Sequence, residues 1–223
     1  MTDVTRARRS RSTLQRPRTG EVRVRLGALG LSTLGVQAIG RIEAVGPEAG
    51  GFAPGDRVAY RFSSLNPPFD QAPGLSHIIG ERDLIGFPKD VAIEQAAALL
   101  PMGLVARAIV KQLHSIGRGN RVRVAPDPGG ADTFVKAWVH HLGALVVEGE
   151  ADVYVTAADY TAARSFRTGH GLAQIAASDV FQAVRLGVFD GLEISSYPLS
   201  DASKAKLAVE SHETSGPVVL LAA

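Results

Sequence analysis

The chain has 223 residues, of which 45% are hydrophobic and 21% are charged, and its formal net charge is +2. This composition is ordinary for a globular protein, so the chain should fold, either as one body or as two small lobes. The absence of cysteine excludes disulfides, thiolate metal ligands and a thiol nucleophile. No stretch approaches the roughly 18–20 uninterrupted apolar residues of a membrane helix, and the N-terminus lacks the apolar core of a secretory signal. We therefore expect a soluble, cytoplasmic protein without a membrane partner.

Residues 1–19 are predicted to be a basic, disordered leader. The segment TRARRSRSTLQRPR is crowded with arginine, whereas the rest of the chain is slightly acidic. Such a tail could contact nucleic acid, but no aromatic interleaving or nucleic-acid-binding motif follows it. Nucleic acid is therefore not expected as a partner.

A β-rich unit is predicted over residues 20–92. It begins with EVRVRLGAL, in which Val22, Val24 and Leu26 alternate with charged residues, the period-two pattern of a half-buried strand. Glycines, β-branched residues and turn signals follow, which indicates a small, bent β-structure. The three prolines between residues 63 and 74 predict a loop.

Helical composition begins at Ile93 and continues to Leu113, in IEQAAALLPMGLVARAIVKQL. Pro101 and Gly103 are expected to break this segment into two helices that bridge two lobes.

A strand, a glycine turn, a helix and a second strand are predicted in that order over residues 120–148. This βαβ order is the seed of a parallel sheet. After it we expect a third strand at ADVYVTAA, a helix at DVFQAVRLGVF, an amphipathic helix capped by Ser200 or Asp201, and a terminal strand at PVVLLAA.

Three segments in the same order resemble the medium-chain dehydrogenase/reductase family, on its quinone oxidoreductase-like branch. They are GVQAIGRIEAVGPEAGGFAPGDRVAY, EQAAALLPMGLVARAIVKQLHSIGRGNRVRVAPDPGGAD and GVFDGLEISSYPLSDASKAKLAVESHETSGPVVLLAA. The resemblance covers most of the chain after the leader. It implies an α/β fold: a GroES-like β-rich lobe at 20–92 with a C-terminal return at 195–223, and bridging helices with a shortened Rossmann-like parallel-sheet lobe at 93–194.

Internal deletions separate this chain from the family pattern. One lies near GALGLSTLG, and a larger one follows ALVVEGE, where the family has its second βαβ crossover. The segment ADVYVTAADY is interpreted as resuming at the strand that lines the nicotinamide pocket.

The resemblance implies NADPH as cofactor, held by a glycine turn in which Gly129 and Gly130 are the cofactor-binding residues. Asp132 stands where the family has its last glycine, and Asp127 lies beside the turn. Carboxylates at a helix N-terminus stabilise the helix but repel a pyrophosphate. Together with Gln37 in place of the family's glutamate, these departures predict weak or absent NADPH binding in the family's manner. No metal is expected, because the ligands of the zinc-using relatives are absent.

Candidate catalytic residues are drawn from two places in the chain. Tyr60 follows the Gly-Asp-Arg-Val turn and could hydrogen-bond a substrate carbonyl, or could simply fill the β-lobe. Asp70 and His77 flank the proline-rich loop and could form an acid–base pair, since histidine titrates near neutral pH.

The residues after the strand ADVYV form the other candidate group. Ligands gather outside the carboxyl ends of parallel strands, so Asp159 and Tyr160 are candidate catalytic residues and Thr156 is a candidate cofactor-binding residue in this loop.

The leading functional hypothesis is a quinone oxidoreductase-like enzyme that acts on an unsaturated or quinone-like carbonyl compound, in biosynthesis. The alternative is a cofactor-independent cyclase, isomerase or dehydratase that folds a polyketide-like substrate in the interlobe cleft. A third class, an inert binding subunit, also remains open. The resemblance further suggests a homodimer.

Overall fold

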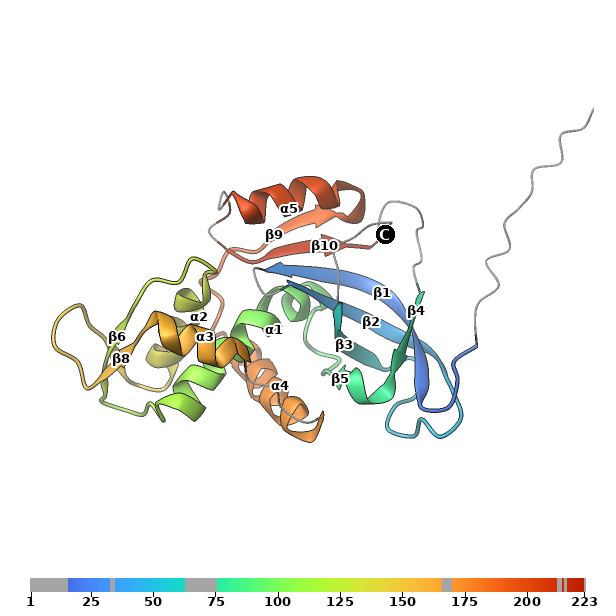
Figure 1. Ribbon diagram of the computed structural model, residues 1–223, viewed down its shortest axis with the longest axis horizontal. Helices are drawn as coiled ribbons and strands as arrows, with labels where there is room; N and C mark the ends of the chain where they lie inside the picture. The colour runs from blue at the N-terminus through green and yellow to red at the C-terminus, as the bar shows by residue number, and fades with distance from the viewer. Residues whose placement is uncertain are drawn as a thin grey trace, which may run out of the picture.

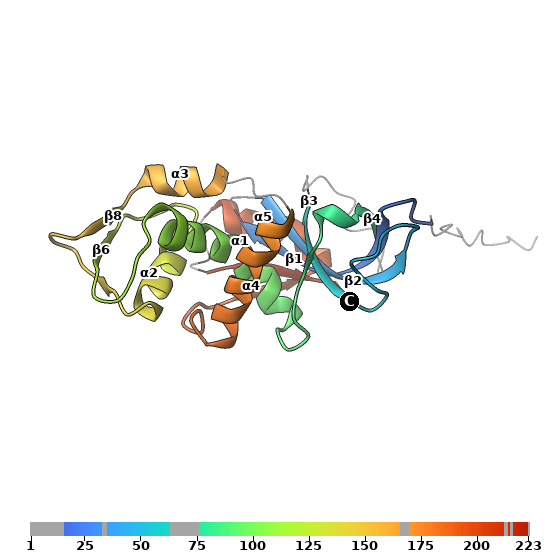
Figure 2. The ribbon, with the colours of Figure 1, turned by 90° about the horizontal axis from the view of Figure 1, so that it is seen from below.

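The computed structural model of the chain describes residues 16–32, 35–62, 76–165, 170–211, 214 and 216–222. They form two sheets with one long helix between them, so that a larger β-rich lobe and a smaller α/β lobe lie side by side along the long axis (Figures 1 and 2). The predicted α/β class, with a β-rich lobe and a parallel-sheet lobe, is confirmed.

The β-rich lobe contains a sheet with strand order β5-β3-β2-β1-β10-β9, in which β4 also pairs with β1. β1 and β2 are antiparallel with two register shifts, and such irregularities bend a strand. β10 runs antiparallel to β1 and parallel to β9, so the end of the chain completes the sheet begun near its start (Figure 1). The strands span Glu21–Ser32 (β1), Gly35–Val45 (β2), Arg57–Phe62 (β3), Ser76–Gly80 (β4), Ile85–Gly86 (β5), Ser195–Pro198 (β9) and Val218–Leu221 (β10).

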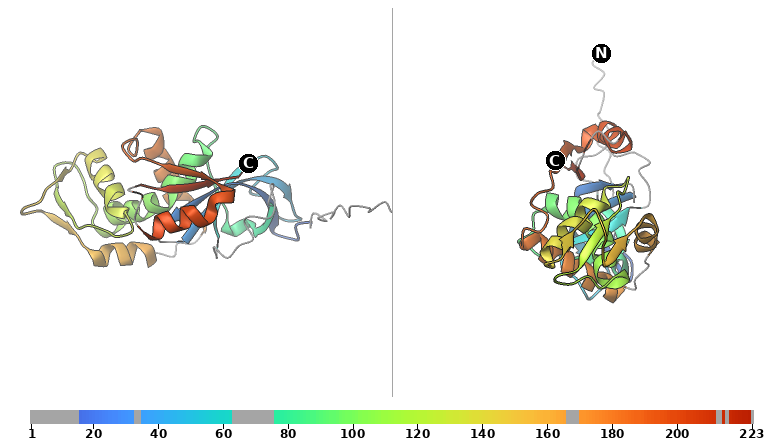
Figure 3. Two further views of the ribbon diagram at one scale, coloured as in Figure 1. Left: turned by 90° about the horizontal axis from the view of Figure 1, so that it is seen from above. Right: turned by 90° about the vertical axis from the view of Figure 1, so that its left-hand side faces the viewer.

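The smaller lobe, which faces the viewer in the right-hand view of Figure 3, contains a parallel sheet of order β7-β6-β8. Its strands are Arg121–Val124 (β6), Leu145–Val146 (β7) and Val153–Val155 (β8). The predicted order of strand, glycine turn, helix and strand is present here. The helices of the chain span Ile93–Ala108 (α1), Ala131–His141 (α2), Ala157–Ser165 (α3), His170–Arg185 (α4) and Ala202–Glu210 (α5), with a π-helical turn at Ile109–Leu113 and 3-10 turns at Glu81–Asp83 and Leu199–Asp201.

The two faces of the large sheet pack into different cores. Ala28 and Ile39 face α1 and join the core that extends into the smaller lobe. Leu29 and Tyr60 belong to a second core, inside the β-rich lobe. Successive residues of a strand point to opposite faces, so the period-two pattern of the sequence supplies both cores.

Helix α1 continues through Pro101 and Gly103, so the predicted break into two helices is wrong. Pro101 offers no N–H to the carbonyl of Ala97, and this carbonyl lies against β1, where a Cβ added to Gly30 would be 1.9 Å from its oxygen. Gly103 lies equally close to α4, because a Cβ there would be 2.6 Å from Val180 Cγ1. Packing on two sides therefore holds the helix together where its local sequence favours a break.

The helical run Ile93–Leu113 is long and apolar enough to cross a membrane by composition, with a mean hydropathy of 1.5. However, 67% of the most apolar 18-residue stretch of this run is buried inside the protein. This burial is typical of the central helix of a globular core, and the position of α1 between the two sheets agrees with it (Figure 1).

Candidate functional site

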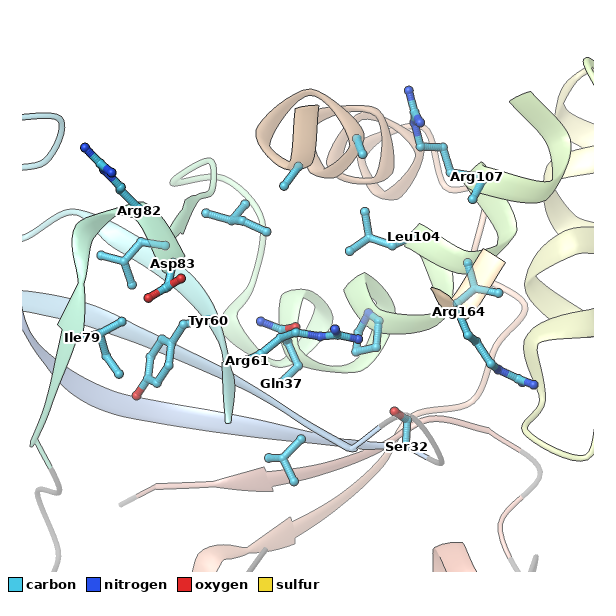
Figure 4. Close-up of a pocket in the computed structure, with 18 of the residues that line it drawn as sticks. Ser32, Gln37, Tyr60, Arg61, Ile79, Arg82, Asp83, Leu104, Arg107 and Arg164 are labelled. Atoms are coloured by element: carbon cyan, nitrogen blue, oxygen red, sulfur yellow. The ribbon is translucent and has the colours of Figure 1, made fainter. Parts of the chain in front are cut away.

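A cleft of about 690 Å³ lies between the two lobes (Figure 4). Strands of the β-rich lobe form one wall, and α1, α3 and α4 form the other. Apolar side chains such as Ile79, Leu104 and Val105 alternate around it with arginine and glutamine side chains. The volume falls within the roughly 300–1,000 Å³ of small-molecule sites, so the cleft can enclose a compact organic ligand.

Gln37 and Arg61 are the polar pair on the α1-facing wall of this cleft. They are cross-strand partners of β2 and β3, so their side chains share one face of the sheet (Figure 4). Gln37 is 7% exposed, and its amide nitrogen has no hydrogen-bond partner among the described residues. Arg61 is exposed. The cleft therefore contains a buried amide donor beside an accessible guanidinium.

Tyr60 lines the cleft but points its hydroxyl away from the cleft centre (Figure 4). Its side chain is 1% exposed, and the hydroxyl lies 2.6 Å from His77 Nδ1. Burial raises the pKa of Tyr60 and lowers the pKa of His77, so the neutral phenol donates to the neutral imidazole. Asp70 falls within 63–75, outside the described residues, and its pairing with His77 stays a prediction.

Sequence reasoning selected Tyr60 but missed Arg61. The two are adjacent in β3, so strand periodicity places them on opposite faces. Tyr60 belongs to the core of the β-rich lobe, while Arg61 faces α1 and the cleft. Gln37 was noticed only as a departure from the family pattern. Its alignment with Arg61 depends on the register of β2 and β3, which the sequence does not reveal.

Thr156 and Asp159 form the start of α3, where the sequence predicted a loop. Asp159 Oδ2 accepts hydrogen bonds from the Thr156 backbone N–H at 2.7 Å and from its hydroxyl at 2.8 Å. Asp159 Oδ1 lies 2.9 Å from His114 Nε2. Although burial acts in the opposite direction, the hydrogen bonds from Thr156 and His114 lower the pKa of Asp159. These contacts fix α3 to the end of the π-helical turn, and neither residue lines the cleft as the structure describes it.

Tyr160 also serves the packing of α3. It is 1% exposed, and its hydroxyl donates to the backbone oxygen of Ala125 at 2.8 Å. Burial, together with the nearby Asp132 and Asp127 carboxylates, raises its pKa. Tyr160 thus joins α3 to the end of β6, immediately before the glycine turn.

The glycine turn between β6 and α2 is closed by a buried carboxylate. Gly130 has the positive φ of 77° that favours glycine, and its N–H donates to the Asp127 carbonyl at 2.8 Å. Asp127 Oδ2 accepts from the backbone N–H of Ala131 at 3.0 Å and from Arg164 Nη2 of α3. The Asp127 side chain is only 3% exposed. Gly129 lies between these contacts and is partly exposed.

Asp132, the other carboxylate of the turn, has a different partner. Its Oδ2 accepts a hydrogen bond from Lys136 at 3.0 Å, one helical turn further along α2. From the sequence, Asp132 and Asp127 were both expected to repel a pyrophosphate. The structure distinguishes them, because Asp127 and not Asp132 accepts the first N–H of the helix.

No protein-family model matches the chain. It is 31% identical over 149 residues to a quinone oxidoreductase of Pseudomonas aeruginosa, covering 59% of this chain and 44% of that protein. It is 27% identical over 154 residues to a 2-haloacrylate reductase of a Burkholderia species, covering 59% of this chain and 45% of that protein. The chain therefore spans less than half the length of these two relatives.

The fold is that of the medium-chain reductases. The structure of Escherichia coli quinone oxidoreductase complexed with NADPH superposes with a TM-score of 0.72 at 19% identity, covering 94% of each chain. This likeness confirms a GroES-like lobe joined to a Rossmann-like lobe. Together with the sequence matches, it confirms the predicted resemblance to the quinone oxidoreductase-like branch of the medium-chain dehydrogenase/reductase family.

The residues at the glycine turn do not fit the pyrophosphate of NADPH. In this class of fold, backbone N–H groups at the helix N-terminus bind the pyrophosphate. Here the Ala131 N–H is bonded to Asp127, and a second carboxylate, Asp132, lies in the first helical turn. Within the described ranges, no group of three or more His, Asp and Glu side chains could hold a metal ion either.

Proposed function

We propose that this chain is a quinone oxidoreductase-like enzyme that binds an unsaturated or quinone-like carbonyl compound in its interlobe cleft. The printed names of its relatives, a quinone oxidoreductase and a 2-haloacrylate reductase, support this substrate class. They offer no support for the cyclase alternative. The observation that carries the proposal is the Gln37–Arg61 pair on the wall of the cleft.

This pair suits a carbonyl oxygen. Gln37 contributes amide N–H groups that lack a described partner, and Arg61 contributes a planar set of charged donors. Such donors stabilise partial negative charge on a carbonyl oxygen, so they can hold and polarise a bound carbonyl group. The apolar walls, which include Leu104 and Val105, accommodate the flat carbon skeleton. The chain's own residues thus bind and polarise the substrate.

Calorimetric titration with 1,4-naphthoquinone tests the proposal. Gln37→Met and Arg61→Met each remove donors while keeping a side chain of similar length, and each should weaken binding about tenfold. Arg123→Met is the matched control, because Arg123 is exposed on β6 and does not line the cleft as described. Equal affinity in all four proteins would refute the assignment of the cleft.

A further inference from the structure

A carboxylate, Asp127, is buried at the start of α2, next to Arg164 of the cleft wall. Acidic side chains are rarely this deeply buried without a charged partner. Asp127 has one, since it bonds Arg164 while also accepting from the Ala131 N–H. An anion therefore already occupies the N-terminus of α2, and the chain itself supplies that anion.

Two further features hold Asp127 in this place. Prolines at 126 and 128 flank it, and each fixes its own φ and restricts the residue before it. Its carbonyl oxygen also accepts the Gly130 N–H. The carboxylate is consequently fixed by the backbone turn as well as by its own bonds.

Helix α3 packs against the glycine turn through two of its side chains. Arg164 comes from α3, lies over the ring of Tyr160 at 5.9 Å, and reaches Asp127. Tyr160 bonds the Ala125 oxygen, immediately before the turn. Residues 147–152 connect β7 directly to β8, without a helix, so α3 follows the small sheet at once. The Asp127 carboxylate is therefore held between the N-terminus of α2 and the side chain of Arg164 from α3.

We propose that Asp127 is a built-in substitute for the cofactor pyrophosphate, and that with Arg164 it closes the glycine turn to nicotinamide dinucleotides. The charges at the turn agree with this, because Arg164 is already paired with Asp127 and a second carboxylate, Asp132, lies in the first turn of α2. A phosphate group would have to displace Asp127 and leave its charge buried, which is strongly unfavourable.

The test is calorimetric titration of the full chain with NADPH and with inorganic pyrophosphate. The unsubstituted protein should show no saturable binding of either at millimolar concentration. Asp127→Ala frees the Ala131 N–H and the Arg164 guanidinium, so pyrophosphate should bind at least about tenfold more tightly than to the unsubstituted protein. Asp127→Ala with Arg164→Met should lose this gain.

Asp132→Ala is the comparison variant: Asp132 bonds Lys136 and does not occupy the Ala131 N–H, so its removal should give a clearly smaller gain in pyrophosphate affinity than Asp127→Ala. Should Asp127→Ala fail to fold, the isosteric Asp127→Asn keeps an acceptor for the Ala131 N–H and should give a smaller gain. Micromolar NADPH binding by the unsubstituted protein, or folded Asp127 variants without any gain, or an equal gain in Asp132→Ala, would overturn the proposal. Naphthoquinone affinity of Asp127→Ala, measured in the same buffer, reports separately on the cleft, because Asp127 does not line it as described, whereas Arg164 does.

Discussion

The hydrogen bond between Tyr60 and His77 ties protonation to the stability of the β-rich lobe. The buried phenol needs an acceptor, and His77 Nδ1 supplies one only while the imidazole is neutral. Burial also lowers the pKa of His77 below its ordinary value of 6.5. In the unfolded chain His77 therefore takes up a proton at a higher pH than in the folded protein.

We predict that this difference makes the protein less stable as the pH falls. Between the two pKa values the unfolded state binds more protons, so the free energy of unfolding rises with pH in that window. The contribution of His77 to the free energy of unfolding is thus fully present above its pKa in the unfolded chain and declines as the pH falls below that value. The free energy of unfolding, measured with urea from about pH 7.5 to pH 5, should fall as the pH falls. His77→Gln should make this dependence on pH less steep. His141→Gln, at an exposed site, should keep the slope of the unsubstituted protein, and an unchanged slope in His77→Gln would contradict the prediction.

At the scale of elements, the sequence predicts strands well because their burial alternates locally. The pattern around Val22, Val24 and Leu26 lies within β1, and these three residues are buried. The glycine turn is equally local, since a positive φ at Gly130 requires glycine. Such features need no knowledge of distant contacts.

The errors arise where distant segments decide the outcome. Pro101 was expected to end a helix, but the packing of Gly30 and Val180 against α1 overrides it. The loop expected after β8 is instead helix α3, whose first turn is fixed by the contact of Asp159 with His114, 45 positions away. The Gln37–Arg61 pair follows from strand register, and the contact between Asp127 and Arg164 joins residues 37 positions apart.

The close approach of β1 to α1 gives an element-scale prediction. A methyl group on Gly30 would collide with the backbone of Ala97, which has no flexible side chain to move. Gly30→Ala should therefore lower the free energy of unfolding by about 3 kcal/mol, at the upper end of overpacking effects. Urea unfolding measures this loss. Gly50→Ala is the control, because Gly50 is exposed with nothing within 4 Å, and equal midpoints in the two variants would rule out the close contact.

At the scale of the whole molecule, one continuous core joins the lobes. It includes Ala28 and Ile39 of the large sheet, the buried face of α1, and Val122 and Val155 of the small sheet. The cleft walls are therefore fixed to a shared core. A charged pair, Arg185 with Asp90, adds only an exposed contact between α4 and the loop before α1.

Gln174 of α4 makes a more specific connection to the β-rich lobe, through strand β5. Its side-chain oxygen accepts the Gly86 N–H of β5 at 2.9 Å, and its amide nitrogen donates to the Gly86 oxygen at 2.9 Å, as a neighbouring strand would. Gln174→Ala removes both bonds and should cost about 1–2 kcal/mol. Because β5 is short and half-buried, the loss should act locally and accelerate hydrogen exchange of the Gly86 amide about tenfold. Gln182→Ala, exposed on the same helix, should leave that exchange rate unchanged. Equal protection of Gly86 in both variants would mean that the core alone, without this side chain, holds α4 against the β-rich lobe.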